Sequence, residues 1–174
     1  MLINVETKLN TDFATVVKYV NLSATLDYIA SPLLVFEPVD PKSYPKIWRH
    51  GDYLVRMKVF GIILLGTQYI RIERIRDKSA TEFILRDNGS GQLAKRWDHW
   101  IFIEKTEKNR VTRYVDRIEV KAGLLTPGVA LFAAIFYRWR QHRWRKLIKN
   151  GFAPLKSHEV NKRDRTSQKS GKRR

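Results

Sequence analysis

Residues 124–151 read LLTPGVALFAAIFYRWRQHRWRKLIKNG, and this stretch predicts one long helix in the last third of the sequence. Thr126 suits the N-cap, and Pro127 suits the first helical position, where its missing N–H costs no hydrogen bond. Gly151 suits the left-handed residue that commonly follows a helix. We therefore expect a helix from Gly128 to Asn150, about 34 Å long.

The two halves of this helix differ in composition. Val129 to Tyr137 are nine consecutive apolar or aromatic residues, which predicts that protein surrounds the first half. The segment Arg138–Lys149 holds six Lys or Arg and no acidic residue. Its apolar residues form a narrower stripe that includes Trp139 and Trp144. Because the rest of the sequence is mostly strand-like, we expect a sheet to cover the first half.

The composition is that of one globular domain with a tail. The chain has 174 residues, of which 43% are hydrophobic, and it has no cysteine, which excludes disulfides and cysteine-based metal sites. We expect a domain over residues 1–152 and a disordered basic tail over 153–174. The first ten residues lack the features of a signal peptide, and the apolar part of the helix is shorter than the roughly 18–20 residues a membrane span needs. A cytoplasmic protein is the expectation.

The positive charge is concentrated at one end of the sequence. The formal net charge is +17, and most of it lies in the segments Arg138–Lys149 and Lys156–Arg174. Such segments attract nucleic-acid backbones and anionic lipid surfaces, so weak non-specific contact with either is one expectation. The alternative is that these arginines are solvated or paired with acids, and that the tail only aids solubility.

The remaining sequence alternates between short helical and strand-like patterns. Leu2–Leu9 reads as a strand, and residues 13–31 read as two short helices with a bend near Asn21. Further strands are expected at 33–37, 52–60, 67–76, 80–86, 94–106 and 110–121, with a turn at Asp87–Gly91. Strands at such short spacing form antiparallel meanders. The fold class is therefore α+β: a curved antiparallel sheet of six to seven strands wrapped around a long helix.

Several segments of the sequence resemble those of a known superfamily. The resemblance rests on PLLVFEPVDP (32–41), FGIILLGTQYI (60–70), RDNGSG (86–91), WDHWIFIE (97–104), TRYVDRIEVKAGLLT (112–126) and FYRWRQHRW (136–144). These segments look like those of bacterial SRPBCC proteins of the START-like, or helix-grip, superfamily, and the resemblance covers roughly residues 2–150. It implies a cavity between sheet and helix that holds an apolar or amphipathic ligand. It implies no particular catalytic residue, because the superfamily has no single chemistry.

Two titratable residues lie on strand faces that are otherwise apolar. His99 shares a face with Trp97, and Asp116 shares one with Tyr114. A hairpin that turns about residues 107–108 would place His99 opposite Asp116, and a shift of two residues would place Tyr114 there. A buried carboxylate would orient the imidazole and raise its pKa. Three roles are open for the pair: the two side chains satisfy each other's hydrogen bonds in the core, orient a ligand or transfer protons. By the same alternation, Arg113 and Arg117 are expected on the outer face.

Three functions follow as hypotheses. The first is binding of a hydrophobic or aromatic small molecule between the sheet and the long helix. The second is a cyclase- or dehydratase-like enzyme, with His99, Asp116 and Tyr114 as the catalytic candidates. The third is association with nucleic acid or a membrane surface through the basic end. The sequence indicates no cofactor and no metal site. The expected ligand-binding residues are Tyr53, Val55, Met57, Ile70, Ile72, Trp97, His99, Tyr114, Asp116, Phe132 and Phe136.

Overall fold

The computed structural model describes residues 1–108 and 110–156, apart from the side chains of residues 74–79. In this part of the chain seven strands form one antiparallel sheet in the order β1-β7-β6-β5-β4-β3-β2. Their bounds are β1 Leu2–Leu9, β2 Leu34–Asp40, β3 Gly51–Val59, β4 Ile63–Ser79, β5 Glu82–Gly91, β6 Arg96–Lys105 and β7 Thr112–Lys121. The predicted α+β class and the meander are confirmed.

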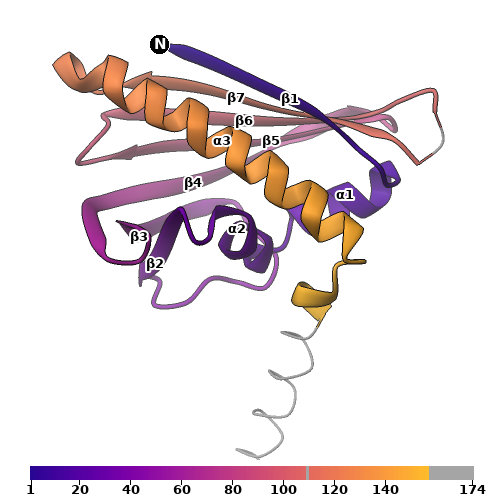
Figure 1. Ribbon diagram of the computed structural model, residues 1–174, viewed down its shortest axis with the longest axis horizontal. Helices are drawn as coiled ribbons and strands as arrows, with labels where there is room; N and C mark the ends of the chain where they lie inside the picture. The colour runs from indigo at the N-terminus through magenta and orange to yellow at the C-terminus, as the bar shows by residue number, and fades with distance from the viewer. Residues whose placement is uncertain (109, 157–174) are drawn as a thin grey trace, which may run out of the picture.

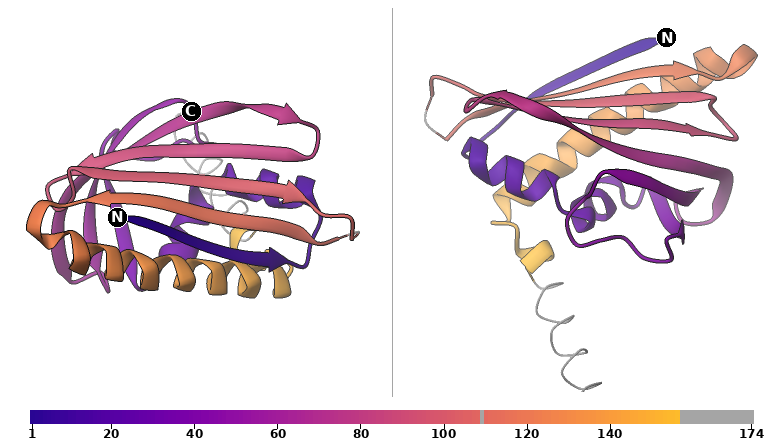
Figure 2. Two further views of the ribbon diagram at one scale, coloured as in Figure 1. Left: turned by 90° about the horizontal axis from the view of Figure 1, so that it is seen from above. Right: turned by 180° about the vertical axis from the view of Figure 1, so that it is seen from behind.

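The sheet curves around one long helix, as predicted. This helix, α3 (Thr126–Lys149), runs diagonally across the sheet and packs on β1, β7 and α2 (Figure 1). The helices α1 (Phe13–Val20) and α2 (Ser23–Ala30) follow β1, and Asp12 caps α1 by accepting a hydrogen bond from the Thr15 N–H at 2.8 Å. The view from behind shows β2 and β3 curling toward the helices, so the concave face of the sheet is enclosed (Figure 2). The interior between sheet and α3 is therefore where a site has to be sought.

The long helix differs from the prediction at its start and in its burial. A 3-10 turn, η1 (Gly123–Leu125), precedes it, and Leu125 is the N-cap in place of Thr126. The Thr126 hydroxyl instead accepts from the Ala122 N–H at 2.9 Å and donates to the Gly123 carbonyl. Protein does not surround the first half, because Leu131 is 65% and Ile135 is 54% exposed. An amphipathic helix on one sheet buries only one face, however apolar the other is.

The segment predicted to turn at Asp87–Gly91 is the end of strand β5. Gly89 pairs with Trp97 and Gly91 pairs with Gln68, so the chain turns after residue 91. A Cβ atom on Gly91 would lie 2.6 Å from the Thr67 carbonyl oxygen, and one on Gly89 would lie 2.9 Å from the Tyr69 carbonyl oxygen. Glycine here permits close approach of neighbouring strands and does not make a turn. As a consequence, Asp87 lies within the strand and lines the interior.

The ordered chain continues past residue 152, where the domain was predicted to end. A helical turn follows α3, in which the N–H of Lys156 donates to the carbonyl of Phe152. Phe152 stacks on Tyr19 with 3.8 Å between ring centroids, and Leu155 is only 4% exposed. Residues 153–156 are thus part of the folded domain. The remaining residues of the predicted tail, 157–174, lie outside the described residues.

Truncation of the chain at two points tests this boundary. Deletion of everything after Gly151 removes the buried side chains of Phe152 and Leu155, and we expect it to lower the free energy of unfolding by roughly 3 kcal/mol or more. Deletion of Lys156–Arg174 is the control, and it should leave the cooperative transition intact. Urea unfolding of both truncated proteins measures the difference. Equal stabilities would contradict a structural role for residues 152–155.

Candidate functional site: a pocket between the sheet and the long helix

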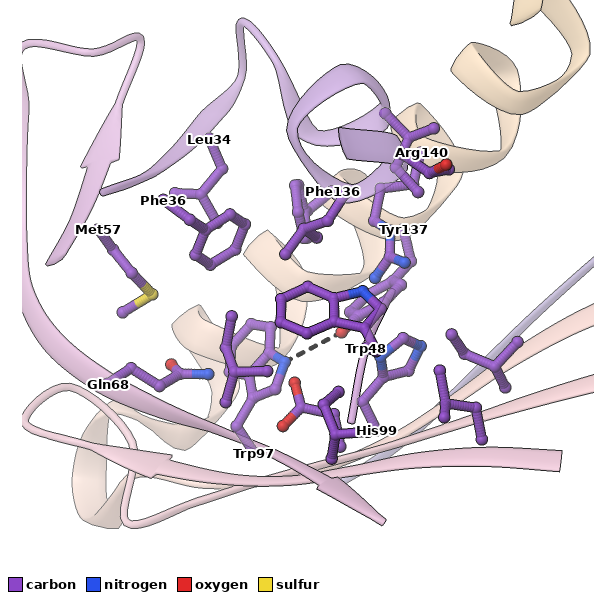
Figure 3. A pocket seen from close by; sticks show the side chains of 18 of the residues that line it. Leu34, Phe36, Trp48, Met57, Gln68, Trp97, His99, Phe136, Tyr137 and Arg140 are labelled. Atoms are coloured by element: carbon purple, nitrogen blue, oxygen red, sulfur yellow. Dashed lines mark hydrogen bonds between the residues drawn. The ribbon is translucent and has the colours of Figure 1, made fainter. Parts of the chain in front are cut away.

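A pocket of about 70 Å³ lies in the interior between the concave face of the sheet, α2 and α3. Its walls are mostly apolar and aromatic: Leu34, Phe36, Met57, Ile70, Ile72, Leu85, Ile101, Phe132 and Phe136 are among the side chains that line it. Figure 3 shows Phe136 and Tyr137 of α3 facing Trp97 and His99 of β6, and its dashed line marks the 3.0 Å hydrogen bond from the Trp97 indole N–H to the Tyr137 hydroxyl. Polar side chains also line it, among them Gln68, Asp87, His99 and Arg140. An apolar concavity with a few convergent polar groups is the usual form of a small-molecule site.

The structure brings together most, but not all, of the residues expected to bind a ligand. Those that line the pocket are Met57, Ile70, Ile72, Trp97, His99, Phe132 and Phe136. The other four, Tyr53, Val55, Tyr114 and Asp116, are buried in the core and do not line the pocket. The predicted strand faces are therefore right, whereas side-chain alternation alone does not show how far along each strand the pocket reaches.

His99 and Asp116 form a buried pair, although the predicted register is wrong. Asp116 lies opposite Ile101, and His99 lies opposite Ile118, which is two residues away from the first predicted register and four from its alternative. In this register the two side chains meet diagonally across the strand pair. The His99 Nε2 atom lies 2.8 Å from Asp116 Oδ1. Diagonal neighbours on one face of an antiparallel pair lie close enough for long side chains to meet.

Asp116 accepts from three side chains. Besides His99, the Gln141 amide donates to Oδ2 at 3.0 Å and the Tyr114 hydroxyl approaches Oδ1 at 3.4 Å. Burial alone would raise the pKa of Asp116, but the positive charge of Arg140 and the hydrogen bonds from His99 and Gln141 hold it below its ordinary value. Burial lowers the pKa of His99 despite its bond to Asp116, contrary to the predicted increase. The pair is therefore an ionised carboxylate and a neutral imidazole.

This charge state fixes the tautomer of His99. Asp116 Oδ1 can only accept, so Nε2 carries the ring proton and donates it to the carboxylate. The other ring nitrogen, Nδ1, then carries a lone pair on a side chain that lines the pocket. Such a nitrogen can accept a hydrogen bond from a ligand or take a proton from it.

Arg140 and Asp87 are two charged pocket residues that the sequence analysis missed. Arg140 comes from the half of α3 in which the arginines were considered solvated, yet it is 5% exposed and lines the pocket. Its guanidinium lies over the rings of Tyr137 and Phe136, at 4.9 and 5.8 Å from their centroids. The helical spacing was the available signal, because 140 follows the buried positions 133, 136 and 137 on the same face. Asp87 was missed because its segment was assigned to a turn.

Asp87 is a carboxyl group in an unfavourable place for charge. Its Oδ1 atom accepts the backbone N–H of Arg71 at 2.8 Å, but burial dominates and raises the pKa of Asp87 to about 7. Between the ordinary pKa of an Asp, about 4, and this value, the native protein holds a proton that the unfolded chain has released. Stability from this site is therefore fully present below about pH 4 and is lost as the pH rises through about 7.

The variant Asp87→Asn tests this behaviour. The neutral amide keeps an acceptor for the Arg71 N–H and cannot ionise. We expect the variant to gain stability relative to the parent protein, by up to a few kcal/mol, as the pH is raised from about 5 to about 8. Urea unfolding at both pH values measures the gain, and Asp40→Asn, at an exposed position, is the control with the same change of charge. A difference between variant and parent that does not change with pH would refute a protonated Asp87 at the pocket wall.

The basic half of α3 contains both exposed and engaged side chains. Arg143 donates to the Tyr28 carbonyl at 3.1 Å, and Arg145 donates to the Thr7 hydroxyl at 2.8 Å. Arg138, Lys146 and Lys149 are at or near the surface. Arg113 lies on the outer face as predicted, where it pairs with Glu6 and Glu104. The expectation of anionic partners for Arg138–Lys149 and Lys156–Arg174 stays a prediction, since most of the second segment lies outside the described residues.

Two features are absent from the residues that the structure describes. No three His, Asp or Glu side chains gather there in a way that could hold a metal ion. Within the same residues, every helix is too short or too polar to cross a membrane.

Comparison with solved structures identifies the fold. A START superfamily protein from Mycobacterium smegmatis superposes with a TM-score of 0.59 and 11% identity over 86% of this chain and 97% of the other. The chain has the START-like fold. A conserved protein from Geobacillus kaustophilus matches the START-like domain with a TM-score of 0.59 and 13% identity, over 86% of this chain and 96% of that one.

One solved structure of the same fold is named for an activity. A truncated norcoclaurine synthase from Thalictrum flavum matches with a TM-score of 0.54 and 11% identity, over 85% of this chain and 92% of the other. At these identities the START-like domain shares a fold with its neighbours and no more. The sequence matches no family model and no curated protein.

Proposed function

We propose that this START-like domain binds a small apolar or aromatic molecule in the pocket between the sheet and α3. The observation that supports the proposal is the pocket itself, because five strands and three helices contribute apolar side chains to its walls while His99 and Arg140 present polar atoms to it. Burying the apolar surface of a ligand among such side chains is favourable by about 25 cal/mol per Å². The volume of about 70 Å³ sets the size: roughly half of a cavity that admits benzene. A molecule with one ring or a short branched chain, entering with small shifts of the half-buried Phe36 and Phe132, is the ligand of this size.

A pocket-filling substitution tests the proposal. Leu85 lines the pocket, and Leu85→Phe places the larger ring in the free space. The next residue, Ile84, does not line it, so Ile84→Phe is a control with the same chemistry on the other face of the strand. We expect para-fluorotoluene, observed by fluorine NMR, to bind the parent protein and the control but not Leu85→Phe. Circular dichroism establishes that all three are folded. Equal binding to all three, or none to the parent, would remove the proposal.

A second candidate function is acid–base catalysis on a bound molecule. It is supported by the 2.8 Å bond between His99 and Asp116, which leaves the neutral Nδ1 atom on a pocket-lining side chain. In this role Nδ1 is the general base and Asp116 is a positioning residue that stabilises the imidazolium as it forms. Tyr114 does not line the pocket, so its part would be limited to its contact with Asp116.

The elimination of a nitrobenzisoxazole, a probe for bases in apolar sites, tests this second candidate. The base removes the ring C–H proton, and the N–O bond breaks to give a nitrile and a phenolate. We expect a rate above that of buffer which His99→Gln abolishes. Because burial lowers the pKa of His99, the rate should fall only at a pH below the ordinary range of imidazole titration, where His99 becomes protonated. A rate that survives His99→Gln would exclude His99 as the base.

A further inference from the structure

The buried guanidinium of Arg140 is the feature of the pocket that the binding of an apolar molecule does not use. Arg140 is 5% exposed and stays charged at every ordinary pH. Its Nε atom is buried without a hydrogen-bond partner, and within the described residues the guanidinium makes no hydrogen bond or ion pair at all. Its neighbours are ring faces, which attract its charge and accept none of its five N–H donors in the plane of the group.

The nearby acids balance the charge of Arg140 without taking its donors. Asp116 acts on it through space, while its oxygens accept from His99, Gln141 and Tyr114. Asp87 acts on it through space as well, and its Oδ1 accepts from the Arg71 backbone. The donors of Arg140 are therefore available to a molecule in the pocket, and an acceptor there would meet a planar fork suited to two oxygens.

These contacts lead to a ligand class, and the step rests on the proposed function of the pocket. We infer that the ligand is a monocarboxylate with a small apolar body, whose carboxylate binds the Arg140 guanidinium and whose body lies against Ile72, Leu85 and Phe136. In this bidentate pairing the two carboxylate oxygens of the ligand accept hydrogen bonds from Arg140 N–H groups that have no acceptor among the described residues. The aromatic and aliphatic walls cover the rest of the molecule. The free volume of about 70 Å³ is smaller than a cavity that admits benzene, so even with small shifts of Phe36 and Phe132 the body is limited to one ring or a short branched chain.

Asp87 links binding of this acid to pH. The titratable and charged groups that face Asp87 are Arg140 and Tyr137 from α3, Arg71 from β4, and Asp98 and His99 from β6, of which His99 lies opposite in the register. Asp98 is held by Arg86 at 2.8 Å, and His99 is neutral, so Asp87 is the group on the pocket whose charge changes near pH 7. Ionised Asp87 repels a carboxylate and protonated Asp87 does not. The carboxylate of the ligand, with a pKa of about 4, stays charged throughout, so binding weakens as the pH rises through about 7.

The experiment uses two probes with the same ring, para-fluorobenzoate and para-fluorotoluene, and the full chain, followed by fluorine NMR. We expect the parent protein to bind the benzoate more tightly than the toluene at about pH 6, and to lose that preference toward about pH 8. Arg140→Met, which keeps a long apolar stem, should weaken benzoate binding about 10–100-fold and change toluene binding little. Arg138→Met, at an exposed position of the same helix, is the matched control and should change neither.

The outcomes of this experiment distinguish the inferred ligand class from the proposed function of the pocket. Binding of the toluene without the benzoate, or benzoate binding that Arg140→Met leaves unchanged, overturns the inference and leaves the proposed function standing. Binding of neither probe to the parent protein overturns both. If Arg140→Met does not fold, Arg140→Lys keeps the charge but not the fork, and should weaken benzoate binding about tenfold. A second measurement needs no Arg140 variant: benzoate binding should depend on pH in the parent protein and not in Asp87→Asn. If the parent protein binds benzoate equally at both pH values, Asp87 does not link binding to pH.

Discussion

Phe136→Ala should lower the free energy of unfolding by about 3–5 kcal/mol. Phe136 is 2% exposed, lies in the middle of α3 and packs against Tyr137, Phe132 and Phe36. Removing its ring enlarges the pocket below it, and the surrounding sheet is too rigid to collapse into the space. The control is the neighbouring Ile135→Ala, because Ile135 is 54% exposed and its truncation should cost less than about 0.5 kcal/mol.

Urea unfolding of the two variants shows whether the loss of stability depends on the burial of the truncated side chain or only on its apolar character. If Phe136→Ala and Ile135→Ala were equally stable, the sheet would not hold the helix by this face. Phe132→Ala should give an intermediate loss, since Phe132 is half-buried at the pocket and exposes part of its ring.

Asp116→Leu should also cost about 3–5 kcal/mol, for an electrostatic reason. It removes the acceptor of His99 and Gln141 and the negative charge that acts most strongly on Arg140. What remains is a buried guanidinium, and of the two acids that act on it among the described residues Asp87 is the one left. Replacing His99 by Leu as well removes one unpaired group but not the arginine, so the His99→Leu, Asp116→Leu double variant should stay destabilised.

Adding Arg140→Met to Asp116→Leu isolates this interaction. We expect the two substitutions together to cost less than the sum of their separate costs, by about 0.5–3 kcal/mol, because the second removes the charge that the first leaves unbalanced. Urea unfolding of the parent, the two single variants and the double variant measures the coupling. Strictly additive losses would show that Arg140 does not depend on Asp116.

The sequence was sufficient for the architecture because its signals are local and periodic. The alternation in residues 52–60 and 94–106 predicted the faces that carry Met57, Trp97 and His99, and the apolar start of residues 124–151 predicted the gripped helix. The exceptions arise where neighbouring elements decide. Gly89 and Gly91 suggest a turn in isolation, but the backbones of β4 and β6 approach so closely that glycine is required within the strand.

The site was less predictable, because it depends on distances between elements far apart in the sequence. The contact between His99 and Asp116 depends on the register of β6 and β7, and a change of two residues in the length of the hairpin changes that register. The predicted register was wrong, although the pair itself was predicted correctly. Trp48 reaches the pocket from a loop with no periodic pattern. In the sequence Arg140 is one of six Lys or Arg residues expected at the surface, and only the packing of α3 against the sheet and α2 buries it.

The two methionines provide the most direct measurement of the central claim, which is that the interior pocket binds a small molecule. Met57 lines the pocket and is 4% exposed, whereas Met1 is 59% exposed and does not line it. In protein labelled at the methionine methyl groups, with Met57→Leu used for assignment, titration with para-fluorotoluene or para-fluorobenzoate should shift the Met57 signal to saturation and leave the Met1 signal in place. A Met57 signal that neither probe moves, or equal small shifts of both signals, would contradict the claim.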